Sequence, residues 1–307
     1  MRQYSRELSV GLALGVLLVG LGVYAPAFYQ AQPLLSLAAR AAPTLLVACG
    51  VALVIICRQI DISVGSQFSV CSVCAGLLAA MHWPLALALP ASILLGTSLG
   101  ALNGSLVAGL GLPSIVVTLA TMVTWREGLR WLREGAWVDL PEGSQWLGLS
   151  QSAGQCSLVL LSLVLLAALA WAMKYLAAGR FVYATGSDAQ AARLAGLRPQ
   201  AVTWAVFALA GALTGLAAMM NVAQSPQVDP NSGNGLELKA IAAAVVGGVP
   251  VSGGRGTLWG VFLGVVLLAC VGPALTHLHV EAYWEKALQG VVILLAVIAD
   301  GERRQGG

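Results

Sequence analysis

Charged side chains are scarce in this 307-residue chain. Only 9% of its residues are Asp, Glu, Lys or Arg, whereas 58% are hydrophobic. Soluble domains carry roughly 25% charged residues, and a water-soluble fold of this size needs more polar surface than this sequence supplies. The composition therefore excludes an ordinary soluble protein and leaves no room for a sizeable soluble catalytic domain. A lipid bilayer removes the difficulty, because lipid can face an apolar exterior.

The sequence also lacks the motifs of several catalytic classes. It contains no G-x-x-x-x-G-K-[ST] phosphate loop, and the nearest glycine-rich turn, residues 253–256, lacks the Lys-Ser/Thr ending. No H-E-x-x-H occurs, and the three histidines are too few and too scattered for a metal site. We therefore expect a chain that is not an enzyme and that binds no cofactor or metal itself. The arginines are spread between apolar segments, which argues against a nucleic-acid partner.

Apolar runs of spanning length follow one another along the chain. Each crossing of roughly 30 Å of hydrocarbon needs about 20 apolar residues. The pattern predicts an all-α fold, a polytopic transmembrane helical bundle of about ten spans, which forms one domain over residues 1–307. The runs cover about residues 8–25, 42–57, 64–81, 84–107, 113–132, 155–177, 200–220, 237–251, 257–275 and 284–299. The first run is expected to be an uncleaved helix rather than a signal peptide.

The distribution of lysine and arginine predicts the orientation in the membrane. Short loops on the side of the N-terminus carry more of these residues than the loops on the other side, and an even number of spans returns the chain to its starting side. We therefore expect a multi-pass protein of the bacterial inner membrane with both termini cytoplasmic. The arginines between 126 and 133 oppose this bias; they are expected to anchor at lipid headgroups or to meet a binding protein.

The longest hydrophilic stretch on the predicted cytoplasmic side is a loop of about residues 179–200. Ser187-x-x-Gln190 has the form of a capping box, and Asp188 falls in the first helical turn, where a negative charge is favoured. Alanines propagate the helix, and Gly196 suits a C-terminal cap with positive φ. The loop is predicted to hold a short cytoplasmic helix. Its small side chains would let another protein approach closely, although a plain connecting helix is the alternative.

This loop and three further stretches match, in order, the motifs of one group of transport proteins. Residues 191–196 read Ala-Ala-Arg-Leu-Ala-Gly, against a typical Ala-Ala-Arg-x-x-Gly core. Residues 59–66, QIDISVGS, follow a Gly-Ile-Asp-Leu-Ser-Val-Gly-Ser pattern, with Gln59 in place of the usual glycine. Residues 233–256 contain a Gly-x-Gly-x-Glu-Leu segment and a Gly-Gly-x-Gly turn, and Asn103-Gly104 also fits. Over about residues 43–300, the chain resembles permeases in the ribose/xylose/arabinose class of bacterial ATP-binding-cassette importers.

The resemblance implies a permease subunit that forms the translocation path for a monosaccharide. Autoinducer-2, a sugar-derived signal carried by related permeases, is the alternative cargo. The implied partners are a second permease copy or a related permease, a periplasmic sugar-binding protein and a cytosolic ATP-binding-cassette ATPase subunit, which would hold ATP and Mg²⁺. The ATPase-coupling residues are then expected to be Ser187, Asp188, Ala191, Ala192, Arg193 and Gly196.

A second group of residues is predicted to lie on the translocation path or at a gate: Asp61, Ser63, Gly65, Asn103 and Glu237. A carboxylate in hydrocarbon must be paired, hydrated or functional. Asp61 could pair with Arg58, cap the third helix or face the path, and Glu237 could stabilise a helix N-terminus or act as a gate. An ion-coupled secondary transporter is a weaker alternative, because both carboxylates lie near predicted helix ends.

Overall fold

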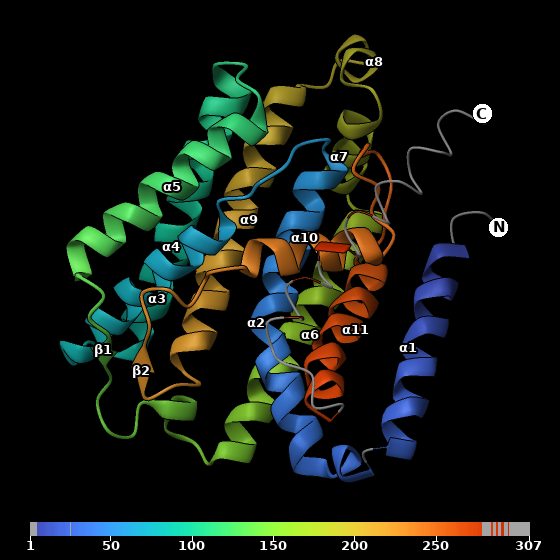
Figure 1. The fold of residues 1–307 in the computed structure, drawn as a ribbon. Helices are drawn as coiled ribbons and strands as arrows, with labels where there is room; N and C mark the ends of the chain where they lie inside the picture. Colours follow the sequence, from blue (N-terminus) through green and yellow to red (C-terminus); the bar gives the residue numbers. More distant parts are fainter. Residues whose placement is uncertain are drawn as a thin grey trace.

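The computed structural model describes residues 5–24 and 26–277, together with the single positions 284, 287, 290, 291 and 294. Helices dominate this part of the chain (Figure 1). The long helices are α1 (Ser5–Tyr24), α2 (Ala31–Ile56), α3 (Val64–Ala80), α4 (Leu85–Gly104), α5 (Ser114–Arg133), α6 (Gln151–Tyr175), α9 (Pro199–Val222) and α11 (Leu258–His277). Shorter elements are η1 (Pro26–Tyr29), η2 (Ser105–Gly109), β1 (Val138–Asp139), η3 (Gln145–Gly148), α7 (Ala177–Ser187), α8 (Ala189–Leu194), β2 (Gln227–Val228) and α10 (Leu236–Val246). The all-α prediction is confirmed.

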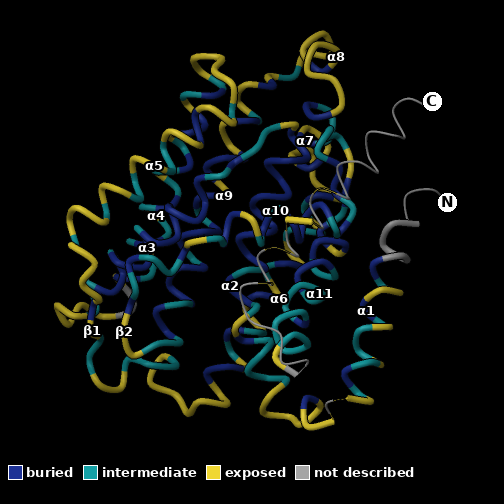
Figure 2. The backbone as a smooth tube through the Cα atoms, viewed as in Figure 1, coloured by how far each residue is buried: buried dark blue, intermediate teal, exposed yellow. Residues whose placement is uncertain are grey.

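Helix α2 forms the centre of the bundle. Its second half, from Leu45 to Ile56, is buried without interruption, and it packs against α6, α9, α10 and α11 (Figure 2). A helix that is apolar on every side is typical of a position inside a large helical protein. The helices around it expose apolar side chains outward, as a lipid-facing surface requires.

Glycines allow α4 and α9 to pack at very short distance. A Cβ on Gly100 would meet the carbonyl oxygen of Phe207, and one on Gly215 would meet that of Ser92. The Ser92 hydroxyl also donates a 2.8 Å hydrogen bond to the Gly215 carbonyl. Small residues spaced four apart bring helix backbones together in membranes, where packing rather than hydrophobicity drives association.

The two ends of the bundle differ. At one end, β1 and β2 pair antiparallel, with Val138 opposite Val228. At the other end α8 projects beyond the helices, and the start of α1 points toward that same end (Figure 1). The loops after α5 and α9 therefore meet at the end of the bundle opposite α8.

The prediction of a full span over residues 237–251 is wrong. Helix α10 has 11 residues, a length of about 16 Å, which does not cross the hydrocarbon layer. Gly235 caps its start and Gly247 its end, and Gly235 and the following Gly248 have positive φ. Among the described residues, five helical segments are long and apolar enough to span: α2, α4 with η2, α6, α9 and α11. Nine of the ten predicted runs then remain, and the run at 284–299 lies almost entirely outside the described residues, so the total number of spans stays a prediction.

Candidate functional site

The loop after α6 forms two helices, of which α8 is the outermost. The Asp188 carboxylate accepts hydrogen bonds from the amides of Gln190, at 2.8 Å, and Ala191, at 3.0 Å. Asp188 is therefore the N-cap, and the predicted cap at Ser187 is wrong: Ser187 is the last residue of α7. Gly196 has a φ of +85°, as its predicted role at the C-terminal cap requires.

Helix α8 exposes most of its side chains. Ala191 and Arg193 are exposed, and Leu194 is 90% exposed at the outer end of the helix. Ala192, in contrast, is only 5% exposed, so its side chain is not part of the exposed surface of α8. Its role in coupling stays a prediction. The large apolar side chain presented to the surroundings is Leu194, which the sequence analysis treated only as a helix former.

The base of this loop contacts the core directly. A Cβ on Gly186 would meet the Ile56 carbonyl oxygen at the end of α2, so the two backbones touch. The Gly254 amide donates to the same carbonyl at 2.8 Å, and the Tyr183 hydroxyl donates to the Gly256 carbonyl, also at 2.8 Å. The end of α7, the end of α2 and the turn before α11 thus form one packed unit beneath α8.

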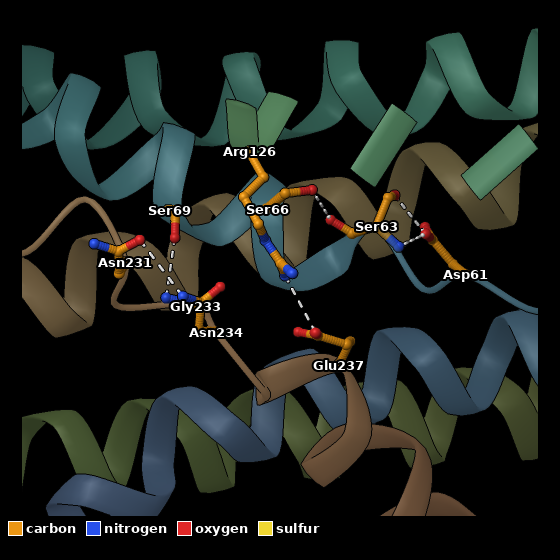
Figure 3. A network of polar contacts seen from close by, with 9 residues as sticks. All are labelled: Asp61, Ser63, Ser66, Ser69, Arg126, Asn231, Gly233, Asn234 and Glu237. Carbon is orange, nitrogen blue, oxygen red and sulfur yellow. Dashed lines mark hydrogen bonds and ion pairs between the residues drawn. The ribbon is translucent and has the colours of Figure 1, made fainter. Parts of the chain in front are cut away.

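A buried polar cluster lies at the start of α3. One Asp61 oxygen accepts from the Ser63 amide at 2.8 Å and from the Ser63 hydroxyl at 2.5 Å (Figure 3). The Gln67 side-chain amide donates to the other Asp61 oxygen at 3.4 Å, and the Asn103 amide donates to the Ser63 hydroxyl at 2.8 Å. Asp61 therefore holds Ser63, the N-cap residue of α3, in place just before the helix begins, and its carboxylate binds none of the backbone amides of the helix. Among the described residues it forms no ion pair with Arg58.

This cluster retains unused hydrogen-bonding capacity. The side-chain oxygens of Gln67 and Asn103 are buried and have no partner among the described residues. Asp61 is 1% exposed and lies in the connection between α2 and α3, outside both helices. Burial raises the pKa of its carboxyl, whereas the hydrogen bonds from Ser63 and Gln67 lower it.

The segment before α10 crosses the N-terminal half of α3 at backbone distance. A Cβ on Gly65 would meet the Gly233 carbonyl at 2.5 Å, and one on Gly233 would meet the Gly65 carbonyl. The Gly233 amide also donates to the Ser69 hydroxyl at 3.0 Å (Figure 3). Gly65 is therefore required by close packing, because any larger side chain would push these segments apart.

Glu237, in the first turn of α10, points toward α5. Its Oε1 accepts from Arg126 at 3.2 Å, and its side chain is 9% exposed, against 24% for Arg126 (Figure 3). Its Oε2 lies over Gly65 and has no partner among the described residues. The predicted position at a helix N-terminus is confirmed, but the ion pair is new. Arg126 therefore reaches into the protein, where the sequence suggested headgroups or a binding protein.

A polar cavity of about 480 Å³ lies on the other side of the segment before α10. Its walls come from six segments: α2, α3, η3, the start of α6, the end of α9 and residues 232–239. The polar lining side chains include Gln155, Asn221, Gln224, Arg40 and Lys239. No local pattern in the sequence indicates this site, because its residues lie on six segments spread between residues 36 and 239.

The described residues offer no group of three or more metal-ligating side chains, and all six cysteines are free. Residues 96–100 match the G-x-S-x-G pattern of serine hydrolases, but they lie inside α4 rather than at a strand-to-helix turn. The Ser98 hydroxyl donates to the Leu94 carbonyl of its own helix. The pattern here is therefore a packing motif.

Comparison with known proteins identifies the family. Residues 34–297 match the model described as branched-chain amino acid transport system / permease component. The chain belongs to this family. It is also 35% identical over 303 residues to the autoinducer 2 import system permease protein LsrC of Escherichia coli and of Shigella flexneri, covering 98% of this chain and 89% of each relative. LsrC of Salmonella typhi is equally similar, with 87% of the relative covered. No solved structure shows significant similarity.

Membership in this permease family establishes a membrane transport protein rather than an enzyme. The geometry groups the predicted residues of this permease into three places. Ser187, Asp188, Ala191, Arg193 and Gly196 lie in or beside the projecting α8, with Ala192 turned inward. Asp61, Ser63 and Asn103 share one buried cluster, and Gly65 and Glu237 meet at the neighbouring contact with the start of α10.

Proposed function

We propose that this permease is the membrane-spanning subunit of an ATP-driven importer, and that it carries a monosaccharide or the sugar-derived signal autoinducer-2 across the bacterial inner membrane. The observation that supports the cargo most is the near full-length similarity to autoinducer 2 import permeases. The family description names branched-chain amino acids instead, so the cargo is to be identified by uptake assays. The described residues carry no site that would hydrolyse ATP, so a separate ATPase subunit would supply the energy with bound ATP and Mg²⁺.

The ATPase subunit would dock on α8. The helix projects at one end of the bundle, is capped at both ends, and exposes Leu194 and Arg193. The packed unit at Gly186, Ile56 and Gly254 would transmit the docking movement to α2 and α11. On this proposal the α8 end is cytoplasmic, both termini lie on that side, and a periplasmic binding protein delivers cargo at the opposite end. A second permease, identical or related, would complete the pathway.

Replacing Leu194 by aspartate tests the docking role. Burying a leucine side chain contributes about 1.5–3 kcal/mol, and every 1.4 kcal/mol is about tenfold in affinity. Leu194→Asp is therefore expected to weaken capture of the ATPase subunit by roughly tenfold to a hundredfold. The matched control is Leu149→Asp, because Leu149 is also exposed, at 52%, but lies between η3 and α6 at the other end.

The measurement is co-purification of the ATPase subunit from membranes, together with ATP-dependent uptake into vesicles. The proposal predicts that Leu194→Asp loses both and that Leu149→Asp retains capture. Normal capture and uptake with Leu194→Asp, at native expression, would show that α8 does not dock the ATPase. Uptake of labelled autoinducer-2 and of D-ribose in the same vesicles would then compare the two cargo classes.

The burial of Asp61 and Glu237 is the observation that could favour an ion-coupled transporter. Both carboxylates, however, already serve local structure, Asp61 by binding Ser63 before α3 and Glu237 as the partner of Arg126. Uptake that persists without ATP but collapses when the ion gradient is dissipated would support this alternative and contradict the ATP-driven proposal.

A further inference from the structure

The polar cavity between α2, α6 and α9 is suited to hold a small molecule. Its volume of about 480 Å³ falls in the range of about 300–1,000 Å³ that is usual for ligand sites. Trp146 and Phe68 supply part of the apolar wall, and hydroxyl, amide and charged side chains supply its polar part. A ligand site typically combines such apolar faces with a few convergent polar groups.

Part of the polar lining is held in place by the protein itself. The Gln155 side chain is 2% exposed. Its amide nitrogen donates to the Ser36 hydroxyl at 3.2 Å, and its oxygen accepts from Gln32, also at 3.2 Å. These bonds join α6 to α2 across the cavity wall. The wall is therefore rigid on this side, as a preformed site requires.

The lining also holds a hydroxyl that is still unused: the buried Ser232 side-chain oxygen has no partner among the described residues. The half-buried Asn221 and Gln224 add two carboxamide side chains to the same lining. Each carboxamide provides two donors and one acceptor oxygen, and a hydroxyl provides both functions. A molecule with several hydroxyl groups would satisfy this mixture, because each of its hydroxyls also donates and accepts.

The charge of the lining narrows the class of ligand further. Arg40 and Lys239 are its formally charged members, and none of the described lining residues is an acid. The Arg40 guanidinium would repel a positively charged ligand, whereas a neutral polyol would be accepted. The same two residues also border a second cavity of about 690 Å³ between α2 and α11, which is mainly apolar.

We propose that the 480 Å³ cavity is a binding site, within a single protomer, for a small polyhydroxylated molecule without positive charge. This inference rests on the proposed function and deepens it, since it assigns a resting place for the cargo away from the Asp61 cluster. The bound molecule contacts the amides of Asn221 and Gln224 and the hydroxyls of Ser225 and Ser232.

A cysteine placed in the cavity tests this assignment without relying on transport. In a background where the exposed Cys156 is replaced by serine, Ser225→Cys introduces a thiol into the lining, and Ser152→Cys introduces one at an exposed position of α6 outside it. The purified permease is treated with an anionic and a cationic methanethiosulfonate reagent of similar size. At each cysteine, the rate with the anionic reagent is divided by the rate with the cationic one. Because the lining carries positive charge, this ratio should be roughly tenfold higher at Ser225→Cys than at Ser152→Cys.

Millimolar D-ribose or autoinducer-2 should then slow the modification of Ser225→Cys severalfold and leave Ser152→Cys unaffected. Gln224→Cys replaces Ser225→Cys if the latter does not fold. Equal reaction with both reagents, a preference for the cationic reagent, or labelling that neither compound slows would each overturn the proposed site. Capture of the ATPase subunit is measured on the same proteins and tests the proposed function independently. A failure of the proposed binding site can therefore be told apart from a failure of the proposed function.

Discussion

Replacing Gly186 by alanine perturbs the contact that connects α8 to the core. The new Cβ would collide with the Ile56 carbonyl oxygen and lie 2.9 Å from the Gly254 amide nitrogen. Both neighbours are backbone atoms that already bond to each other at 2.8 Å. Neither can rotate away as a flexible side chain would, so α7 must move outward as a unit.

Overpacking of this kind costs about 1–3 kcal/mol. The exposed face of α8 is unchanged, so Gly186→Ala should still capture the ATPase subunit. Transmission to α2 depends on the displaced contact, and we expect ATP-dependent uptake to fall at least tenfold, which corresponds to about 1.4 kcal/mol. The thermal unfolding midpoint in detergent should fall as well, and the uptake loss should exceed what the remaining folded fraction explains.

Gly109→Ala is the matched control, because a Cβ at Gly109 meets nothing within 4 Å. It makes the same chemical change at the end of η2 and should leave capture, uptake and unfolding midpoint near those of the native permease. If Gly186→Ala transports at the native rate, the contact with Ile56 does not transmit docking. If it loses capture and uptake together, α8 itself has been distorted, and the separation of docking from transmission is refuted.

Three further changes test other parts of the structure. Asp61→Ala should lower the free energy of unfolding by roughly 2 kcal/mol, because Ser63 before α3 loses its buried acceptor, and Asp61→Asn should lower it less. A denaturation curve equal to that of the native chain would contradict this role of Asp61. Arg126→Leu should destabilise the folded permease by about 1–2 kcal/mol, and adding Glu237→Leu should recover part of this loss, because a lone buried carboxylate is costly. If the losses of stability from the two changes simply add, the two residues are not coupled. Cysteines at Asp139 and Leu194 should react with an impermeant reagent from opposite sides of the membrane, and reaction from one side alone would refute the topology.

Local patterns in the sequence determined the class of protein and the position of most helices. Scarce charge and repeated apolar runs require a membrane environment whatever the tertiary contacts are. The short helix at α8 and the left-handed glycine at 196 also follow from residues within a few positions of each other. The cap was misplaced by one residue, from Ser187 to Asp188, since both side chains can accept the same amide bonds and only backbone geometry separates them.

Only the tertiary structure decided which distant residues meet. Arg126 and Glu237 are 111 positions apart, and no local pattern pairs them. The inward turn of Ala192 and the exposure of Leu194 depend on how α8 rests on α7 and α9, while helix propensity treats both residues alike. The apolar run at 237–251 has the composition of a span, yet Gly235 and Gly248, both with positive φ, stop α10 at both ends. The neighbouring Gly233 and Gly247 lie at backbone distance from α3 and α11, where a larger residue would not fit. The polar cavity arises from six segments that only packing assembles, because side-chain periodicity reports which face of a helix is polar and not what lies opposite it.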